Sequence, residues 1–142
     1  MEPDLLVIGG AVGASLGGPA GWSAFLHVQA TADSMKLCGV ERNVLLNEAD
    51  VLPFVAALRW YHDTQFKDGD QPTVLCCTDS PAMVTAGVDR ALRNQDDWRA
   101  LEVFEDLGYQ IQWSLESRDR NPAIFQEAAR VRRELIDAVS HG

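Results

Sequence analysis

Three segments with the hydrophobic pattern of β-strands follow one another near the start of this chain, before any helical pattern begins. Residues 5–12 form a short, continuous apolar run that is rich in branched side chains, as in a buried strand. Residues 21–30 and 34–41 instead alternate apolar with small or polar side chains, which is the two-residue period of a strand. Successive strands of this kind predict an antiparallel meander at the start of the fold.

The hydrophobic period then changes, and helices and strands follow each other over the rest of the chain. From Asn47 the apolar residues have helical spacing, with Pro53 in the first turn, where its missing N–H has no helical partner. The remaining predicted elements are a strand over 72–80, a helix capped by Ser80 with Pro81 at its first position, a helix over 96–108, a strand over 109–117 and a helix over 121–139. The order is β-β-β-α-β-α-α-β-α, and 142 residues suffice for one domain.

Two of these helices carry apolar stripes that predict which face is buried. In the helix over 96–108 the inward residues are Trp98, Leu101, either Phe104 or Glu105, and Leu107, with Gly108 as the stop signal. In the closing helix the stripe consists of Ile124, Ala128, Val131, Leu135 and Val139.

The glycine-rich stretch VIGGAVGASLGG, residues 7–18, does not have the pattern of a nucleotide-binding loop. A dinucleotide-binding fingerprint needs G-x-G-x-x-G followed at once by a helix. Neither the register from Gly9 nor that from Gly10 fits, and the segment that follows has a strand pattern. No Gly-Lys-Ser/Thr sequence of a phosphate-binding loop occurs either. We interpret the glycines as a tight hairpin connection.

The charge of the chain is acidic, with one basic segment. The formal net charge is −9, whereas a nucleic-acid-binding protein normally carries the opposite balance. Residues 118–133 hold five arginines against Asp119 and Glu127, a local charge of +3. Any site for a polyanion would therefore have to be local.

The sequence predicts a cytoplasmic protein without a membrane partner. No apolar run approaches the roughly 18 residues of a membrane span, and the first ten residues are acidic where a signal peptide would be basic. Cys76 and Cys77 are adjacent within an apolar run, which is typical of buried thiols rather than of a disulfide framework or a metal site.

Taken in order, several segments resemble motifs of the ribonuclease H family. They are GGPAGWSAFL (17–26), NEADVLPFVAALRW (47–60), TDS (78–80), NQDDW (94–98) and WSLESRDRNPAIFQEAAR (113–130). The resemblance implies one α/β domain over residues 1–142. Its fold would be a mixed five-stranded sheet, an antiparallel meander and then parallel strands, flanked by helices.

The resemblance also implies a chemistry. Members of that family hold two Mg²⁺ or Mn²⁺ ions with four carboxylates and hydrolyse a phosphodiester of an RNA–DNA hybrid. It assigns catalytic and metal-binding roles to Asp79 and to Asp50, which stands where the family has Glu. Substrate contacts would come from Asn47, Ser80, Arg118, Arg120 and Asn121.

Two of the four carboxylates have no counterpart in this chain. The first-strand position falls at Gly9 or Gly10, and the closing-helix position falls at Phe125. Glu48, expected just outside the helix start, and Glu127, about 200° around its helix from Phe125, are the acids that could compensate. The resemblance therefore implies a degenerate active site.

Simpler structural roles exist for the same residues. Asp79 and Ser80 can act as an N-cap pair for the next helix, and Phe125 can be a core residue. The arginines can form a solvated helix face that is paired with Glu127 and Glu134.

Three functions stay open at this point. The first is a non-hydrolysing module that binds nucleic acid or protein, with no metal. The second is an active endonuclease with an altered metal site, and the third is a homo-oligomeric scaffold without nucleic-acid contact.

Overall fold

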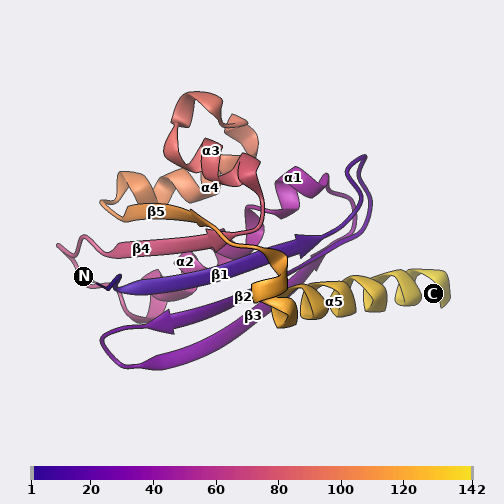
Figure 1. Cartoon of the computed structure of the whole chain (residues 1–142), viewed down its shortest axis with the longest axis horizontal. Coiled ribbons are helices and arrows are strands. Elements are labelled where there is room, and N and C mark those ends of the chain that lie inside the picture. Colours follow the sequence, from indigo (N-terminus) through magenta and orange to yellow (C-terminus); the bar gives the residue numbers. More distant parts are fainter. Residues whose placement is uncertain (1, 142) are drawn as a thin grey trace.

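The computed structural model, which describes residues 2–141, contains a five-stranded sheet in the order β3-β2-β1-β4-β5 (Figure 1). The strands are β1 (Leu5–Val12), β2 (Ala20–Val28), β3 (Asp33–Glu41), β4 (Thr73–Thr78) and β5 (Gln110–Leu115). β1, β2 and β3 pair antiparallel, whereas β4 runs parallel to β1 and β5 parallel to β4. The mixed sheet expected from the order of elements is thus confirmed.

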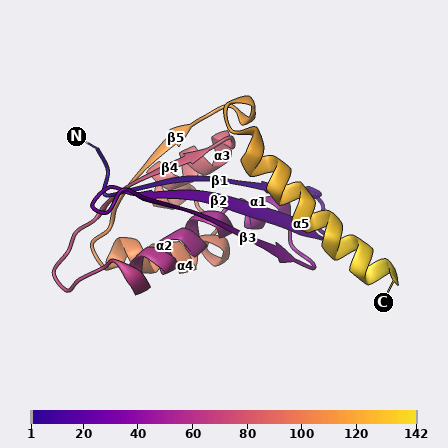
Figure 2. The ribbon, with the colours of Figure 1, turned by 90° about the horizontal axis from the view of Figure 1, so that it is seen from below.

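Helices lie on both faces of this sheet. They are α1 (Leu46–Ala49), α2 (Leu52–Thr64), α3 (Pro81–Val88), α4 (Gln95–Asp106) and α5 (Pro122–His141), with short 3-10 helices at Arg90–Leu92 and Arg118–Arg120. Figure 2 shows α2 and α4 on one face and α5 crossing the other. α5 contacts β1, β2 and β3 but extends past them at its carboxyl end (Figure 1). No helix in the described part of the chain is both long enough and apolar enough to span a bilayer.

The main hydrophobic core lies between the sheet and the layer formed by α2 and α4. Its fully buried side chains include Leu5, Val7, Leu26, Phe54, Leu58 and Leu101. Trp113 of β5 meets Phe54 and Trp98 edge to face, with ring centroids 5.1 and 5.3 Å apart. The alternation of residues 21–30 and 34–41 predicted one buried face for each strand, and Leu26 and Leu37 lie on the face that packs against this core.

The helix expected from Asn47 is divided in two. α1 ends at Ala49 and α2 begins at Leu52, because Pro53 has no N–H to donate to the carbonyl of Ala49 four residues earlier. α1 begins at Leu46, so the expectation that Glu48 stands just outside the helix was wrong. Glu48 lies in the first turn, where an acid complements the helix dipole.

Ser80 caps α3 as predicted, since its hydroxyl accepts a hydrogen bond from the Met83 N–H at 3.3 Å. The helix ends at Val88. Asp89 is extended, and its carboxylate accepts from the Ala91 N–H at 3.0 Å, which starts a separate 3-10 turn.

Two residues of the predicted apolar stripes are exposed. Leu107 caps the carboxyl end of α4, and Tyr109 takes the buried position there instead. Val139 is 62% exposed, because the last turns of α5 lie beyond the sheet (Figure 1). Leu135 is half-buried, and the other stripe residues of these two helices are buried.

A buried arginine joins the helices that follow β4. The guanidinium of Arg93 donates to the carbonyls of Ala86 and Gly87 at 2.7 and 2.9 Å. It also binds the carboxylates of Glu102 and Glu105 on α4. Because its side chain is only 1% exposed, removal would leave the acceptors without a partner.

We expect Arg93→Ala to lower the free energy of unfolding by about 3–5 kcal/mol, the usual cost of breaking a buried ion pair. Arg99→Ala is the matched control, since Arg99 is exposed and its contact with Asp96 spans 3.8 Å; its effect should stay within about 0.5 kcal/mol. Urea unfolding followed by circular dichroism measures both. Equal effects of the two substitutions would contradict this account.

Candidate functional site

The acidic residues singled out in the sequence converge near the carboxyl ends of β1 and β4. Asp79 follows the last residue of β4 directly, and Asp50 lies in the break between α1 and α2. The pKa of Asp50 is raised from 3.8 to about 7, mainly by burial and further by the negative charge of Asp79, whereas Arg118 opposes the shift. Two carboxylates in electrostatic contact thus share this corner with one guanidinium.

Arg118 supplies the positive charge of the site. It stands in the 3-10 turn before α5, and its Nε donates to Asp79 Oδ2 at 3.3 Å. Its guanidinium carbon lies 4.2 Å from the ring centroid of Phe125, a cation–π contact. The carboxylate of Asp79 is therefore paired with a cation of the chain itself.

The two glycines of β1 point to opposite faces of the sheet. A Cβ on Gly9 would stand 3.0 Å from Phe54 and Pro53 of α2, whereas a Cβ on Gly10 would stand 2.5 Å from the Phe125 ring. In the parallel pair of β1 and β4, Ile8 lies opposite Cys77. Gly10 and Asp79 each follow two residues later, so side chains at these two positions point toward the same face of the sheet. A side chain at position 10 would thus stand beside Asp79, where the ring of Phe125 now lies.

Asn47 and Ser80 line a small pocket next to this corner. The pocket has a volume of about 170 Å³, and Asp50 also borders it. Asn94 and Asp97, which the sequence reasoning did not select, line it as well. Both belong to the NQDDW segment. The sequence signal that could have pointed to them was an N-cap Asn followed by acidic residues at the start of a helix.

The other predicted residues make local contacts. The Asn121 amide donates to Glu116 at 2.9 Å, and Arg120 is exposed. Glu127 is held by Arg130 on the side of α5 that faces β3. Its pKa is lowered by that hydrogen bond, and the acid-paired helix face predicted for the arginines is present there.

This set of side chains does not fit a two-metal centre. Mg²⁺ and Mn²⁺ need several oxygen ligands, whereas Gly10 and Phe125 offer none and Arg118 brings a positive charge to Asp79. Among the residues that the structure describes, no three His, Cys, Asp or Glu side chains gather in a way that could hold a metal ion.

No protein-family model and no curated protein sequence matches this chain. Solved structures do match over almost its whole length. The N-terminal RNase H domain of a Mycobacterium tuberculosis protein has a TM-score of 0.77 at 13% identity and covers 97% of this chain and 99% of its own. An LC11 RNase H1 in complex with an RNA/DNA hybrid has a TM-score of 0.77 at 11% identity, covering 93% and 99%.

RNase H1 from the halophilic archaeon Halobacterium salinarum is similar as well, with a TM-score of 0.62, 18% identity, and coverage of 94% of this chain and 98% of that one. The fold is therefore RNase H-like, as the sequence motifs imply. At such identities the likeness concerns the fold alone.

The contact between Gly10 and Phe125 predicts coupled effects on stability. Gly10→Ala should cost about 1–3 kcal/mol, because the new methyl group displaces the ring. Phe125→Ala leaves a cavity and should cost about 3–5 kcal/mol. The double variant should cost about 1–3 kcal/mol less than the sum of the two.

Gly9→Ala is the matched control for this cycle, since its methyl group would meet α2 rather than Phe125. We expect its cost to add to that of Phe125→Ala. Chemical denaturation of the single and double variants gives both coupling energies, and additivity in the Gly10 cycle would show that the two residues do not contact each other.

The raised pKa of Asp50 predicts how stability depends on pH. The folded state keeps the proton of Asp50 up to about pH 7, whereas the unfolded chain loses it near pH 3.8. Between these values the folded state binds more protons, so this residue makes the free energy of unfolding fall as pH rises. Asp50→Asn should remove that part of the slope between pH 4 and 7.

Thermal unfolding of the wild type and of Asp50→Asn across this pH window measures the difference. In carboxyl-carbon NMR spectra, Asp79→Asn should lower the pKa of Asp50 and Arg118→Ala should raise it. Identical pH slopes for wild type and Asp50→Asn would disprove the assignment.

Proposed function

We propose that this chain is an RNase H-like domain that does not carry out metal-dependent hydrolysis and acts as a protein-binding module. The observation that carries the proposal is the contact of the Phe125 ring with Gly10, at the place where a carboxylate would stand beside Asp79. In this proposal Gly10 and Phe125 are the lost positions of the family, and Asp50 and Asp79 are the residual ones.

The charge around Arg118 supports this loss of function. In a metal site the positive charge that balances the carboxylates comes from the ions. Here a guanidinium already binds Asp79, and a metal ion would have to displace it. Glu127 offers no replacement ligand, because Arg130 holds its carboxylate on the flank of α5 that faces β3.

A protein partner fits the charge better than a nucleic acid does. Arg118 and Arg120 share a 3-10 turn with Asp119. Asp50 and Asp79 lie in the same corner, Asp97 lines the adjoining pocket, and the whole chain carries −9. A phosphate backbone needs a surplus of basic side chains. The LC11 enzyme bound to an RNA/DNA hybrid shares the fold, and this likeness makes the hybrid the ligand to test against the proposal.

Titration calorimetry with Mn²⁺, run beside cleavage of a labelled RNA–DNA hybrid, tests the proposal. We expect no stoichiometric metal binding and no cleavage by the wild type. The variant Gly10→Asp/Asp50→Glu/Phe125→Asp, which restores four carboxylates, should gain Mn²⁺ binding. This variant removes the Phe125 ring and supplies the missing carboxylates at the same time.

Metal binding with cleavage by the wild type, both lost in Asp79→Asn, would establish an active enzyme with an altered site. Binding of the hybrid without cleavage, measured by fluorescence anisotropy, would instead show that the partner is a nucleic acid and not a protein. Sedimentation velocity detects the third case, a homo-oligomer.

A further inference from the structure

β3 is an edge strand with an unoccupied side. It covers nine residues and pairs only with β2 within the described part of the chain. The backbone N–H and C=O groups along its outer side are thus available to another strand. A strand that pairs there would extend the sheet by one position.

The two faces of this edge differ in chemistry. On the α2 side, Leu37 is half-buried and packs against the hydrophobic core, as Trp60 does. On the α5 side, Lys36 and Cys38 are exposed. A strand added to β3 would therefore meet an apolar surface on one face and a polar surface on the other.

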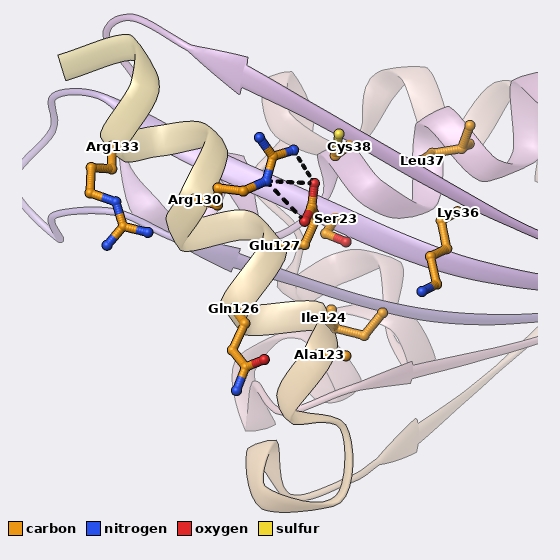
Figure 3. A pocket seen from close by; sticks show the side chains of 10 residues that line it. All are labelled: Ser23, Lys36, Leu37, Cys38, Ala123, Ile124, Gln126, Glu127, Arg130 and Arg133. Atoms are coloured by element: carbon orange, nitrogen blue, oxygen red, sulfur yellow. Dashed lines mark hydrogen bonds and ion pairs between the residues drawn. The ribbon is translucent and has the colours of Figure 1, made fainter. Parts of the chain in front are cut away.

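α5 leaves a groove on this polar side, because the helix sits over β2. A Cβ on Gly21 would stand 2.0 Å from the carbonyl oxygen of Ala128, so glycine allows the helix to lie directly on that strand. Between α5 and β3 the groove has a volume of about 600 Å³ (Figure 3). Ser23 and Ile124 are among its lining residues.

The lining of this groove is basic, although the chain as a whole is acidic. Lys36, Arg130 and Arg133 stand against Glu127 and against Glu134, which Arg130 also binds, so the groove keeps a surplus of one positive charge in a chain with −9. Figure 3 shows the Arg130–Glu127 pair on the helix side and Lys36 on the strand side. Within residues 2–141, no ion pair holds Lys36 or Arg133.

We propose that an extended segment of a partner protein, with alternating apolar and acidic residues, adds to β3 as a sixth strand. Its backbone pairs with β3, its apolar side chains continue the surface of Leu37, and its acidic side chains face Lys36 and the groove. Apolar and acidic residues alternate in the proposed segment because successive side chains of a strand point to opposite faces of the sheet, and these two faces differ along β3.

A second copy of this chain is a poorer occupant. Antiparallel pairing of β3 with itself about Leu37 would place Asp33 opposite Glu41, and like charges opposite each other destabilise a strand pair. Each copy also brings a net charge of −9. The basic lining of the groove favours an acidic segment of another protein over the β3 strand of a second copy.

The probe for this site is an acetylated nine-residue peptide in which Glu alternates with Val or Leu. A control peptide has the same composition with Glu and the apolar residues in separate blocks. We expect the alternating peptide to protect alternate β3 amides from hydrogen exchange, and the block peptide to leave them unprotected.

Lys36→Glu should weaken binding of the alternating peptide about tenfold in fluorescence anisotropy. Lys67→Glu is the matched control, because Lys67 is the other lysine of the chain and is also exposed, outside the groove. It should leave the affinity unchanged. Both lysines are at the surface, so neither substitution threatens folding.

The proposal fails if the alternating peptide does not bind, if the block peptide binds equally well, or if the protected amides lie outside β3. A dimer held through β3 would also overturn it. None of these outcomes depends on hydrolysis, so failure here is distinct from the discovery of an active metal site at Asp50 and Asp79.

Discussion

Close approach of α5 to the sheet depends on two glycines. Gly10 accommodates the Phe125 ring, and Gly21 lies under the backbone of Ala128. A side chain at either position would lift the helix or displace the ring. Because the helix is held over β1 and β2, its first turns reach the corner beside Asp79, while a groove remains between it and β3. The candidate site and the groove are therefore two results of one helix position.

The corner at Asp79 shows how a half-buried carboxylate is paired with a cation of the same chain. Arg118 donates to Asp79 and lies on the Phe125 ring, so one side chain satisfies a carboxylate and covers an aromatic surface. Asp50, deeper in the corner, has no direct partner of this kind. Burial then shifts its pKa toward the neutral form. The same corner thus holds one carboxylate that is paired with a guanidinium and one whose pKa is raised by burial.

Features that depend on local sequence could be predicted, and features that depend on distant contacts could not. The strand alternation and the Ser80 cap need only neighbouring residues, and both were predicted. The break before α2 had a local signal in Pro53, but its effect on the residues before it was missed. The contact of Phe125 with Gly10 joins residues that are 115 positions apart, as counted in the sequence, and no pattern in either segment indicates it. The burial of Arg93 was also missed, because it depends on Glu102 and Glu105 of α4, which no local pattern connects to Arg93.

The pairing of Gly10 with Phe125 also constrains how this sequence can change over evolutionary time. An acid gained at position 10 alone meets the ring, and one gained at position 125 alone exchanges a packed aromatic for a charge near Asp79. Each single step costs stability, although the two together remove the clash. The present sequence and one with carboxylates at both positions are thus separated by less stable intermediates, and this local epistasis makes either acid hard to gain by single substitutions.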